Sequence, residues 1–473
     1  MGLSNVLEAF ASIIHDPSLF EAARIIKSSF TREDGKMPLR YLLNYLIFRH
    51  GRTLSEDINC FYSDLRINDR PSKQAVLKRM SILNHGVWQK IQELFLDRIY
   101  LPMEKKNYKG YLLISIDGTF INLPDDSSLG ETFGRRECGY KNGEAHYGIP
   151  QAKVSIAYDV LNHIVLDFRV AHCDTSEIPL LFQHLEALES VLKNDKVILL
   201  ADRYYGSAEL FKYCEMKGWK YLVRAKSNFF RKQRAEIPAE CKDAWLTILI
   251  DRIWQKRIIR PAIQAFISEH PEMRIRLLRN HYEYEEEHTT SSGNKIRVPK
   301  SADTEYFTNL PQEEFSHDEI VNLYHNDRWD IETGYDILKN LIDIEEFNSA
   351  RANVIYNQIM SRFIFSNLKS LLYNAASEKI QKDKEHLINN KNIIEKCHSS
   401  SFVRAFFKKK FSLKYVRSCI KECSRFKVMV RGERHLKRWD KFKGKIDNTR
   451  HRLDGRRNPP LKITKTGIMT SNH

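Results

Sequence analysis

The sequence is organised around one stretch, residues 316–342, SHDEIVNLYHNDRWDIETGYDILKNLI. It predicts a single long helix, because no proline interrupts it and because Ser316 and Glu319 form a capping box at its start. At about 100° per residue, the apolar side chains from Ile331 to Ile342 form one stripe. Beside this stripe, five side chains fall on one line: Tyr324, Arg328, Glu332, Tyr335 and Lys339. The apolar face is therefore expected to pack against the protein core, and the face beside it presents the Glu332 carboxylate between the cations Arg328 and Lys339.

Such a face has a plain interpretation as a solvated surface with i to i+4 ion pairs. A functional interpretation is favoured by two upstream aspartates, each directly after an apolar run that predicts a buried strand. Asp117 follows residues 111–116, YLLISI, and Asp202 follows residues 196–201, KVILLA. Each aspartate is either a turn or cap residue or part of a site at the carboxyl end of its strand.

The order of the predicted elements indicates the fold. Two β-type runs at residues 154–158 and 164–170 predict a hairpin, and a helix over residues 178–192 follows a second capping box at Asp174 to Glu177. Strand, hairpin, helix, strand, helix, strand and late helix is the order of an RNase H-like α/β fold. In that fold the strands that carry Asp117 and Asp202 are neighbours, so both carboxylates meet at one sheet edge.

Three acids at one place repel one another unless a cation neutralises them. Asp117, Asp202 and Glu332 therefore predict a site for a hard, oxygen-seeking ion, Mg²⁺ or Mn²⁺. Two such ions can activate an attacking water or hydroxyl and stabilise the leaving oxygen of a phosphoryl transfer. The expected chemistry is that of nucleases and strand-transfer enzymes.

We expect three regions: a helical N-terminal domain at residues 1–105, the RNase H-like catalytic domain at residues 110–345 and a helical region with a basic tail at residues 346–473. Residues from about 227 to 302 fit the catalytic pattern poorly and predict an insertion. In the first region, residues 72–80 place Lys73, Gln74, Lys78 and Arg79 among apolar residues. They form either a DNA recognition helix or a helix that docks on the next domain.

The charge is concentrated at the C-terminal end. The net charge is +16, whereas residues 401–473 hold 22 Lys and Arg against 5 Asp and Glu, a net of +17. Such a tail attracts polyanions through phosphate neutralisation, which makes nucleic acid the favoured partner over a membrane surface. With no apolar run of spanning length and no secretory signal, we expect a protein of the cytoplasm.

The cysteines show no paired framework, which is typical of a reducing compartment. A zinc site at Cys397, His398, Cys419 and Cys423 is disfavoured, because an adjacent Cys and His cannot easily share one tetrahedral ion.

The sequence resembles the DDE transposases of bacterial insertion sequences, specifically the insertion sequence four family. The resemblance rests on Ile116-Asp117-Gly118-Thr119, on Ala201-Asp202-Arg203-Tyr204-Tyr205 and on Tyr324 to Lys339. Arg328, Glu332 and Lys339 stand at the family's spacing, whereas Tyr324 lies one residue further from Arg328 than in the family pattern. The long insertion before Glu332 is a further likeness.

This resemblance implies that Asp117, Asp202 and Glu332 are the catalytic, metal-binding acids. It implies that Tyr324, Arg328 and Lys339 contact DNA. Trp329 either stacks on a base near the transposon end or belongs to the core. It also implies cutting at terminal inverted repeats, joining to target DNA, and a homodimer that bridges two ends of double-stranded DNA at the bacterial nucleoid. Three alternatives stand beside it: a DNA nuclease of the same fold, a domesticated DNA-binding descendant, and a membrane or acidic-protein partner for the tail.

Overall fold

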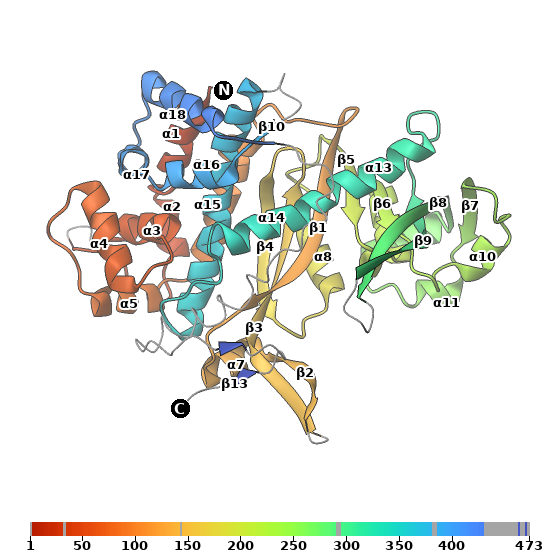
Figure 1. The fold of residues 1–473 in the computed structure, drawn as a ribbon, viewed down its shortest axis with the longest axis horizontal. Helices are drawn as coiled ribbons and strands as arrows, with labels where there is room; N and C mark the ends of the chain where they lie inside the picture. The colour runs from red at the N-terminus through yellow and green to blue at the C-terminus, as the bar shows by residue number, and fades with distance from the viewer. Residues whose placement is uncertain are drawn as a thin grey trace.

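The structure is a computed structural model that describes residues 2–31, 35–141, 144–289, 295–380, 386–429, 462–463 and 469–470. A mixed α/β centre separates a layer of helices from a strand-rich extension, as Figure 1 shows. Most of the basic tail, residues 430–461, lies outside the described residues, so its predicted contact with DNA remains a prediction.

Apolar runs build the middle of the sheet. β1 (Tyr111–Asn122), β5 (Lys196–Ala201) and β6 (Lys220–Arg224) lie side by side and run parallel. Five of the six residues of β5 are buried, as are the first six of β1. Strands covered on both faces need such continuous apolar sequence. The predicted adjacency of the two strands that precede Asp117 and Asp202 is confirmed.

Among the described residues, the central sheet has nine strands in the order β2-β3-β1-β5-β6-β9-β8-β7, with β4 paired to β3. The predicted hairpin is present as β3 (Glu144–Asp159) and β4 (Ile164–His172), which pair antiparallel. The remaining elements of this part are α7 (Ser127–Phe133), β2 (Arg135–Lys141), α8 (Glu177–Leu188), the short 3-10 helix η2 (Arg203–Tyr205) and α9 (Ala208–Met216). The capping box predicted at Asp174 to Glu177 is wrong, because the residue before α8 is Ser176 and its side chain makes no capping hydrogen bond.

β1 is longer than the sequence predicts. The apolar run stops before Asp117, which suggested that the strand ends there, but β1 continues to Asn122. Its pairing with β5 stops at Ser115, while its pairing with β3 continues to the register pair Asn122–Gln151. Asp117 therefore lies just beyond the point where β1 loses its neighbour on the β5 side.

The late helix is divided in two. The capping box of Ser316 and Glu319 is present at the start of α13 (His317–Asp327), but α14 begins anew at Trp329 and ends at Asn340. Between them Arg328 keeps helical dihedral angles, and Ile331 N donates to Arg328 O at 3.3 Å. That bond spans three residues, so the helix tightens locally at Arg328. The prediction of one uninterrupted helix is wrong at this residue.

The two flanks of the chain pack together in the helical layer. The N-terminal helices are α1 (Leu3–Ile13), α2 (Ser18–Ala22), α3 (Leu39–Phe48), α4 (Leu54–Leu65), α5 (Lys73–Ser81) and α6 (Gly86–Phe95), followed by the π-helical turn η1 (Leu96–Tyr100). The C-terminal ones are α15 (Ala352–Lys379), α16 (Asn390–Cys397), α17 (Ser400–Phe407) and α18 (Leu413–Arg425). α15 is buried on all sides, because α1, α3, α5, α6 and α18 pack around it and β4 lies against it.

Buried polar side chains form hydrogen bonds between the helices of this layer. Arg362 of α15 is 1% exposed and donates to the backbone carbonyls of Leu46, Ile47 and Arg49, the open carbonyls at the end of α3. Trp88 Nε1 donates to Asn357 Oδ1 at 2.8 Å. The layer is thus one unit made from both ends of the chain. Short strand pairs also occur: β10 (His386–Ile388) with β11 (Lys427–Met429), and β12 (Lys462–Ile463) with β13 (Met469–Thr470).

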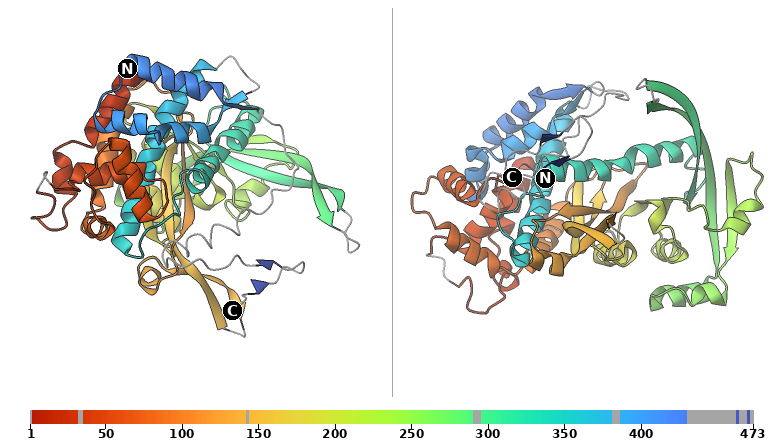
Figure 2. Two further views of the ribbon diagram at one scale, coloured as in Figure 1. Left: turned by 60° about the vertical axis from the view of Figure 1, so that its left-hand side comes forward. Right: turned by 60° about the horizontal axis from the view of Figure 1, so that its bottom comes forward.

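The extension at the other side comes from the predicted insertion. It contains α10 (Arg231–Ala235), β7 (Asp243–Leu249), α11 (Arg252–Gln255), α12 (Pro261–Glu269), β8 (Glu272–Thr289) and β9 (Lys295–Thr308). β8 and β9 form a long ribbon, clear in the right-hand view of Figure 2. The last residues of β9 pair with β6, so the insertion continues the central sheet.

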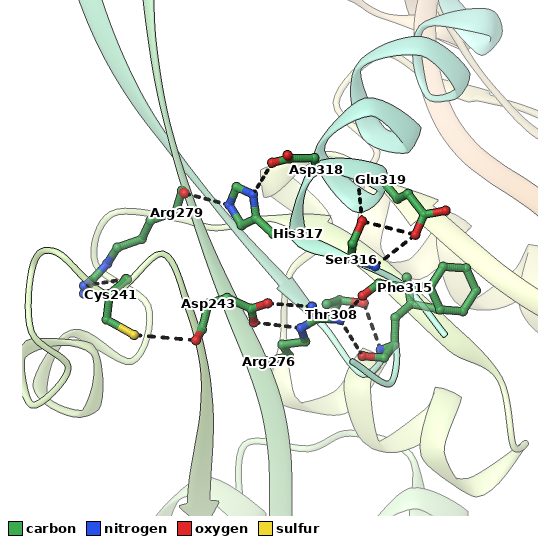
Figure 3. A network of polar contacts seen from close by, with 11 residues as sticks. Cys241, Asp243, Arg276, Arg279, Thr308, Phe315, Ser316, His317, Asp318 and Glu319 are labelled. Atoms are coloured by element: carbon green, nitrogen blue, oxygen red, sulfur yellow. Dashed lines mark hydrogen bonds and ion pairs between the residues drawn. The ribbon is translucent and has the colours of Figure 1, made fainter. Parts of the chain in front are cut away.

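A buried arginine joins the insertion to the start of α13. Arg276 of β8 is fully buried and binds the Asp243 carboxylate through two bonds of 2.8 Å and 2.6 Å. Its third nitrogen donates to the carbonyls of Leu310 and Phe315, in the loop before α13. Figure 3 shows this network, in which His317 Nε2 also lies 2.9 Å from Arg279 O. The insertion therefore holds the loop from which the late helices start.

Candidate catalytic site

Asp117 lies in the middle of β1 and is half-buried. Burial raises the pKa of its carboxyl to about 7, because removing the group from water penalises its charged form. The amide of Gly118 and the Arg328 guanidinium act in the opposite direction, whereas the carboxylates of Glu177 and Glu332 add to the rise. Two groups that the sequence predicts for the site, Arg328 and Glu332, therefore lie near Asp117, together with Glu177, which it does not predict.

Asp202 directly follows β5 and is the residue that starts η2. Its backbone carbonyl accepts from Tyr205 N at 3.0 Å, which closes the turn and leaves the carboxylate at the end of the strand. Its charge acts on Arg328, raising that pKa, and also on Lys226. Asp202 therefore occupies the turn position considered from sequence, but its carboxylate makes no capping hydrogen bond to η2.

α13 and α14 bring the third acid over this edge. Glu332 Oε1 lies 2.5 Å from Arg328 Nη2, and the Arg328 side chain is only 14% exposed. Burial opposes the charge on Arg328, but Tyr324, Glu332, Asp202 and Asp117 together raise its pKa above the ordinary value. One guanidinium therefore interacts with all three predicted acids.

The other residues on the predicted line also reach the two strands. Tyr324 OH donates to Ala201 O at 3.4 Å, next to Asp202, and its ring lies 5.6 Å below the Arg328 guanidinium. Tyr335 OH donates to Asp117 O at 2.6 Å. Lys339 Nζ donates to Thr119 Oγ1 at 2.7 Å. The face predicted from the sequence is the one that lies on β1 and the end of β5, and Figure 1 shows α14 crossing β1 there.

Trp329 is the first residue of α14, but its side chain lies outside what the structure describes. Its stacking on DNA and its alternative place in the core both remain predictions.

Glu177 is a fourth acid at the site that sequence reasoning missed. It is the first residue of α8, and a Cβ placed on Gly118 would lie 3.2 Å from its Oε1. Its charge raises the pKa of Asp117 and that of the buried Tyr205. Lys153 Nζ, 3.9 Å away, partly balances it. The glycine after Asp117 was the available signal, since glycine permits close approach of another group to the backbone.

The donor set suits a hard divalent cation, because it consists of carboxylates. Within the described residues, the only three ligand side chains with atoms within 4.8 Å of one another are His172, Cys173 and Asp174. Asp117, Asp202 and Glu332 would therefore have to draw closer to share one ion.

The disfavoured zinc site receives no support. Cys397, Cys419 and Cys423 are buried free thiols, and burial raises the pKa of each. Together with His398 they do not form a metal-ligand group in the part of the chain that the structure describes.

The four polar residues of the candidate recognition helix α5 differ in exposure. Lys73, Gln74 and Lys78 are exposed, whereas Arg79 donates to Met37 O at 3.1 Å and covers the Phe30 ring at 4.3 Å. Arg79 is thus a packing residue, and the two interpretations of the other three stand. No helix of the described chain is long and apolar enough to cross a bilayer.

Residues 108–368, more than half of the chain, match the profile of the family described as transposase DDE domain. No curated protein matches the chain. Among solved structures, the chain is similar to the cryo-EM structure of a piggyBac transposase synaptic complex with hairpin DNA, at 11% sequence identity and a TM-score of 0.44. That similarity covers 88% of this chain and 84% of the other.

Proposed function

The chain belongs to the transposase DDE domain family, and we propose from this premise that it cuts DNA at the terminal inverted repeats of an insertion sequence and joins the ends to target DNA. Members of this family act in DNA transposition and generally use divalent metal ions.

One observation carries the proposal: the partly buried Arg328 guanidinium forms an ion pair with Glu332, and the charges of Asp117 and Asp202, which come from two other elements, also raise its pKa. A surface ion pair on a solvated helix would involve neighbours on that helix alone. Here two of the acids come from adjacent strands, more than 120 residues upstream of Glu332 in one case and more than 200 in the other. This convergence supports a catalytic role for the three acids.

We propose that Asp117, Asp202 and Glu332 would hold two divalent cations, Mg²⁺ or Mn²⁺, which when bound supply activation of the attacking oxygen and stabilisation of the leaving one. Arg328 balances part of the negative charge of the three acids before an ion binds. Arg328 and Lys339 would then contact DNA phosphates beside the cut. Tyr324 holds the Asp202 side of the site through Ala201 O, and Trp329 is the proposed stacking residue.

We further propose that the central strands form an RNase H-like domain, at residues 110–345, of an insertion sequence four transposase. The order β4-β3-β1-β5-β6, with β3 antiparallel to both of its neighbours, supports this. So does the strand-rich insertion between Asp202 and Glu332. Residues 1–105 and the basic tail would bind DNA, and a homodimer would bridge two ends of the element.

The test is cleavage of a labelled duplex that carries the element's own end, with Mg²⁺ and with EDTA. We expect metal-dependent cutting by the wild type and none by Asp117→Asn. The matched control is Asp336→Asn, which removes an exposed carboxylate from α14.

Three outcomes are informative. Cutting at the repeat boundary, followed by joining to a second DNA, supports the transposase. Cutting without preference for the repeat indicates a nuclease of the same fold. Binding of DNA without cutting under Mg²⁺ or Mn²⁺ indicates a domesticated DNA-binding descendant.

A further inference from the structure

The backbone carbonyl of Asp117 is held by side chains from two other elements. Tyr335 OH of α14 donates to it at 2.6 Å, and Ser155 Oγ of β3 donates to it at 3.2 Å. β1 has lost its pairing with β5 at this point, since that register ends at Ser115. These two bonds therefore add to the pairing with β3 at a residue that no longer pairs with β5.

Ser155 is itself the end of a chain of polar contacts. His184 Nε2 of α8 lies 3.0 Å from Ser155 Oγ, and His184 Nδ1 lies 2.7 Å from Asp167 Oδ2 of β4. Arg169 Nε donates to the same carboxylate oxygen at 2.8 Å. The chain crosses from β4 through α8 and β3 to β1, the four elements that surround the first acid.

Ser155 Oγ contacts both Asp117 O and His184 Nε2, and a serine hydroxyl has one hydrogen to donate. His184 Nδ1 faces a carboxylate oxygen, which accepts. When Ser155 donates to Asp117 O, its oxygen accepts from His184 Nε2, so both ring nitrogens of His184 act as donors in the arrangement that we propose. Ser155 is 1% exposed and His184 is fully buried, so no substrate reaches either. A role as a nucleophile and base is excluded by this burial.

We propose that Ser155, His184 and Asp167 are positioning residues that fix the Asp117 peptide, and through it the direction of the Asp117 carboxylate. This role rests on the proposed function. A carboxylate that holds a metal must keep its place to within about 0.5 Å, and bonds behind the ligand supply that restraint. The same helix α8 places Glu177 beside Gly118, the residue that follows Asp117.

Four substitutions test the role. Ser155→Ala removes the donor to Asp117 O, and Ser155→Thr keeps a hydroxyl. His184→Gln places an amide nitrogen near the position of Nε2, whereas His184→Asn places one near Nδ1. Ser361→Ala is the matched control, because Ser361 is also fully buried and also donates to a backbone carbonyl, but in α15.

The readouts are the single-turnover cleavage rate at saturating DNA, the affinity for Mn²⁺ measured by electron paramagnetic resonance, the DNA affinity and the thermal midpoint. Loss of a partner behind a metal ligand typically lowers metal affinity or activity by about 10- to 100-fold. We expect a loss of about tenfold or more in rate and in Mn²⁺ affinity for Ser155→Ala and His184→Asn, with unchanged DNA affinity. Ser155→Thr, His184→Gln and Ser361→Ala should retain most of both.

The outcomes separate the two proposals. If the wild type cuts DNA and binds Mn²⁺ and Ser155→Ala matches it within about twofold, the positioning role is refuted and the proposed function stands. A wild type that neither cuts nor binds Mn²⁺ overturns both. If Ser155→Ala fails to fold, His184→Gln and His184→Asn are compared instead. An equal loss of cleavage rate and Mn²⁺ affinity in these two variants contradicts the role.

Discussion

Replacing Asp117 by asparagine is expected to stabilise the metal-free protein at neutral pH, although it should abolish cleavage. The reason is the pKa of the carboxyl, which burial raises from 3.8 to about 7 in the folded protein. A folded-state pKa above the unfolded one means that the folded protein binds the proton more tightly. Stability from this group is therefore fully present below pH 3.8 and is lost as the pH rises to about 7.

The magnitude follows from the shift. A rise from 3.8 to about 7 is about three pKa units, and at about 1.4 kcal/mol per unit the charged carboxylate costs the folded state about 4 kcal/mol above neutral pH. The linkage relation makes this cost about 2 kcal/mol at pH 5 and about 4 kcal/mol at pH 8. Asparagine has no such charge, so the difference between variant and wild type should grow over this range.

The assay is urea denaturation in EDTA at pH 5, 6, 7 and 8, with wild type, Asp117→Asn and the control Asp336→Asn. Asp117→Asn should gain stability with increasing pH relative to the wild type, and saturating Mg²⁺ should reduce the gain by stabilising the wild type alone. A difference that is constant across the pH range, or an Asp117→Asn protein that is less stable at pH 8, would refute the reasoning.

Other variants test the neighbouring contacts. Glu332→Gln should abolish cleavage and leave DNA affinity nearly unchanged in a gel-shift assay; retained cleavage would remove Glu332 from the site. Arg328→Ala should weaken DNA binding and reduce the slope of affinity against salt by about one, and an unchanged slope would contradict a phosphate contact. Arg276→Met should cost up to about 3–5 kcal/mol in denaturation, because it leaves the partly buried Asp243 carboxylate without its ion-pair partner and the carbonyls of Leu310 and Phe315 without their donor. The double variant Arg276→Met/Asp243→Asn should recover part of that loss, and no recovery would show that packing dominates.

Local sequence was sufficient for the elements that carry the predicted acids. The apolar runs before Asp117 and Asp202 are buried strands because only such runs can be covered on both faces of a sheet. The capping box at Ser316 formed as predicted, because it depends on residues three apart in the chain. Tyr324, Tyr335 and Lys339 still face β1 and the end of β5, because Arg328 keeps helical dihedral angles where the helix is divided.

Local sequence failed where the outcome depends on a distant partner. β1 continues beyond Asp117 because β3 offers it further backbone partners. The helix tightens at Arg328, a residue whose pKa is raised by the charges of Asp202 and Asp117 from distant parts of the chain. The apolar character of α15 indicated burial, but its neighbours come from both ends of the chain, which no local pattern specifies.

The amino-acid sequence by itself thus determined which residues are able to do chemistry: two acids after buried strands and a third on an amphipathic helix. The tertiary structure decided which further residues join them. Glu177 approaches Gly118, and His184 reaches Ser155, because α8 packs against β1 and β3. Ser155 reaches the Asp117 peptide because β3 pairs with β1. Their single sequence positions carry no periodic signal. Periodicity reports the burial of a face, whereas a hydrogen bond between elements is set by how those elements pack.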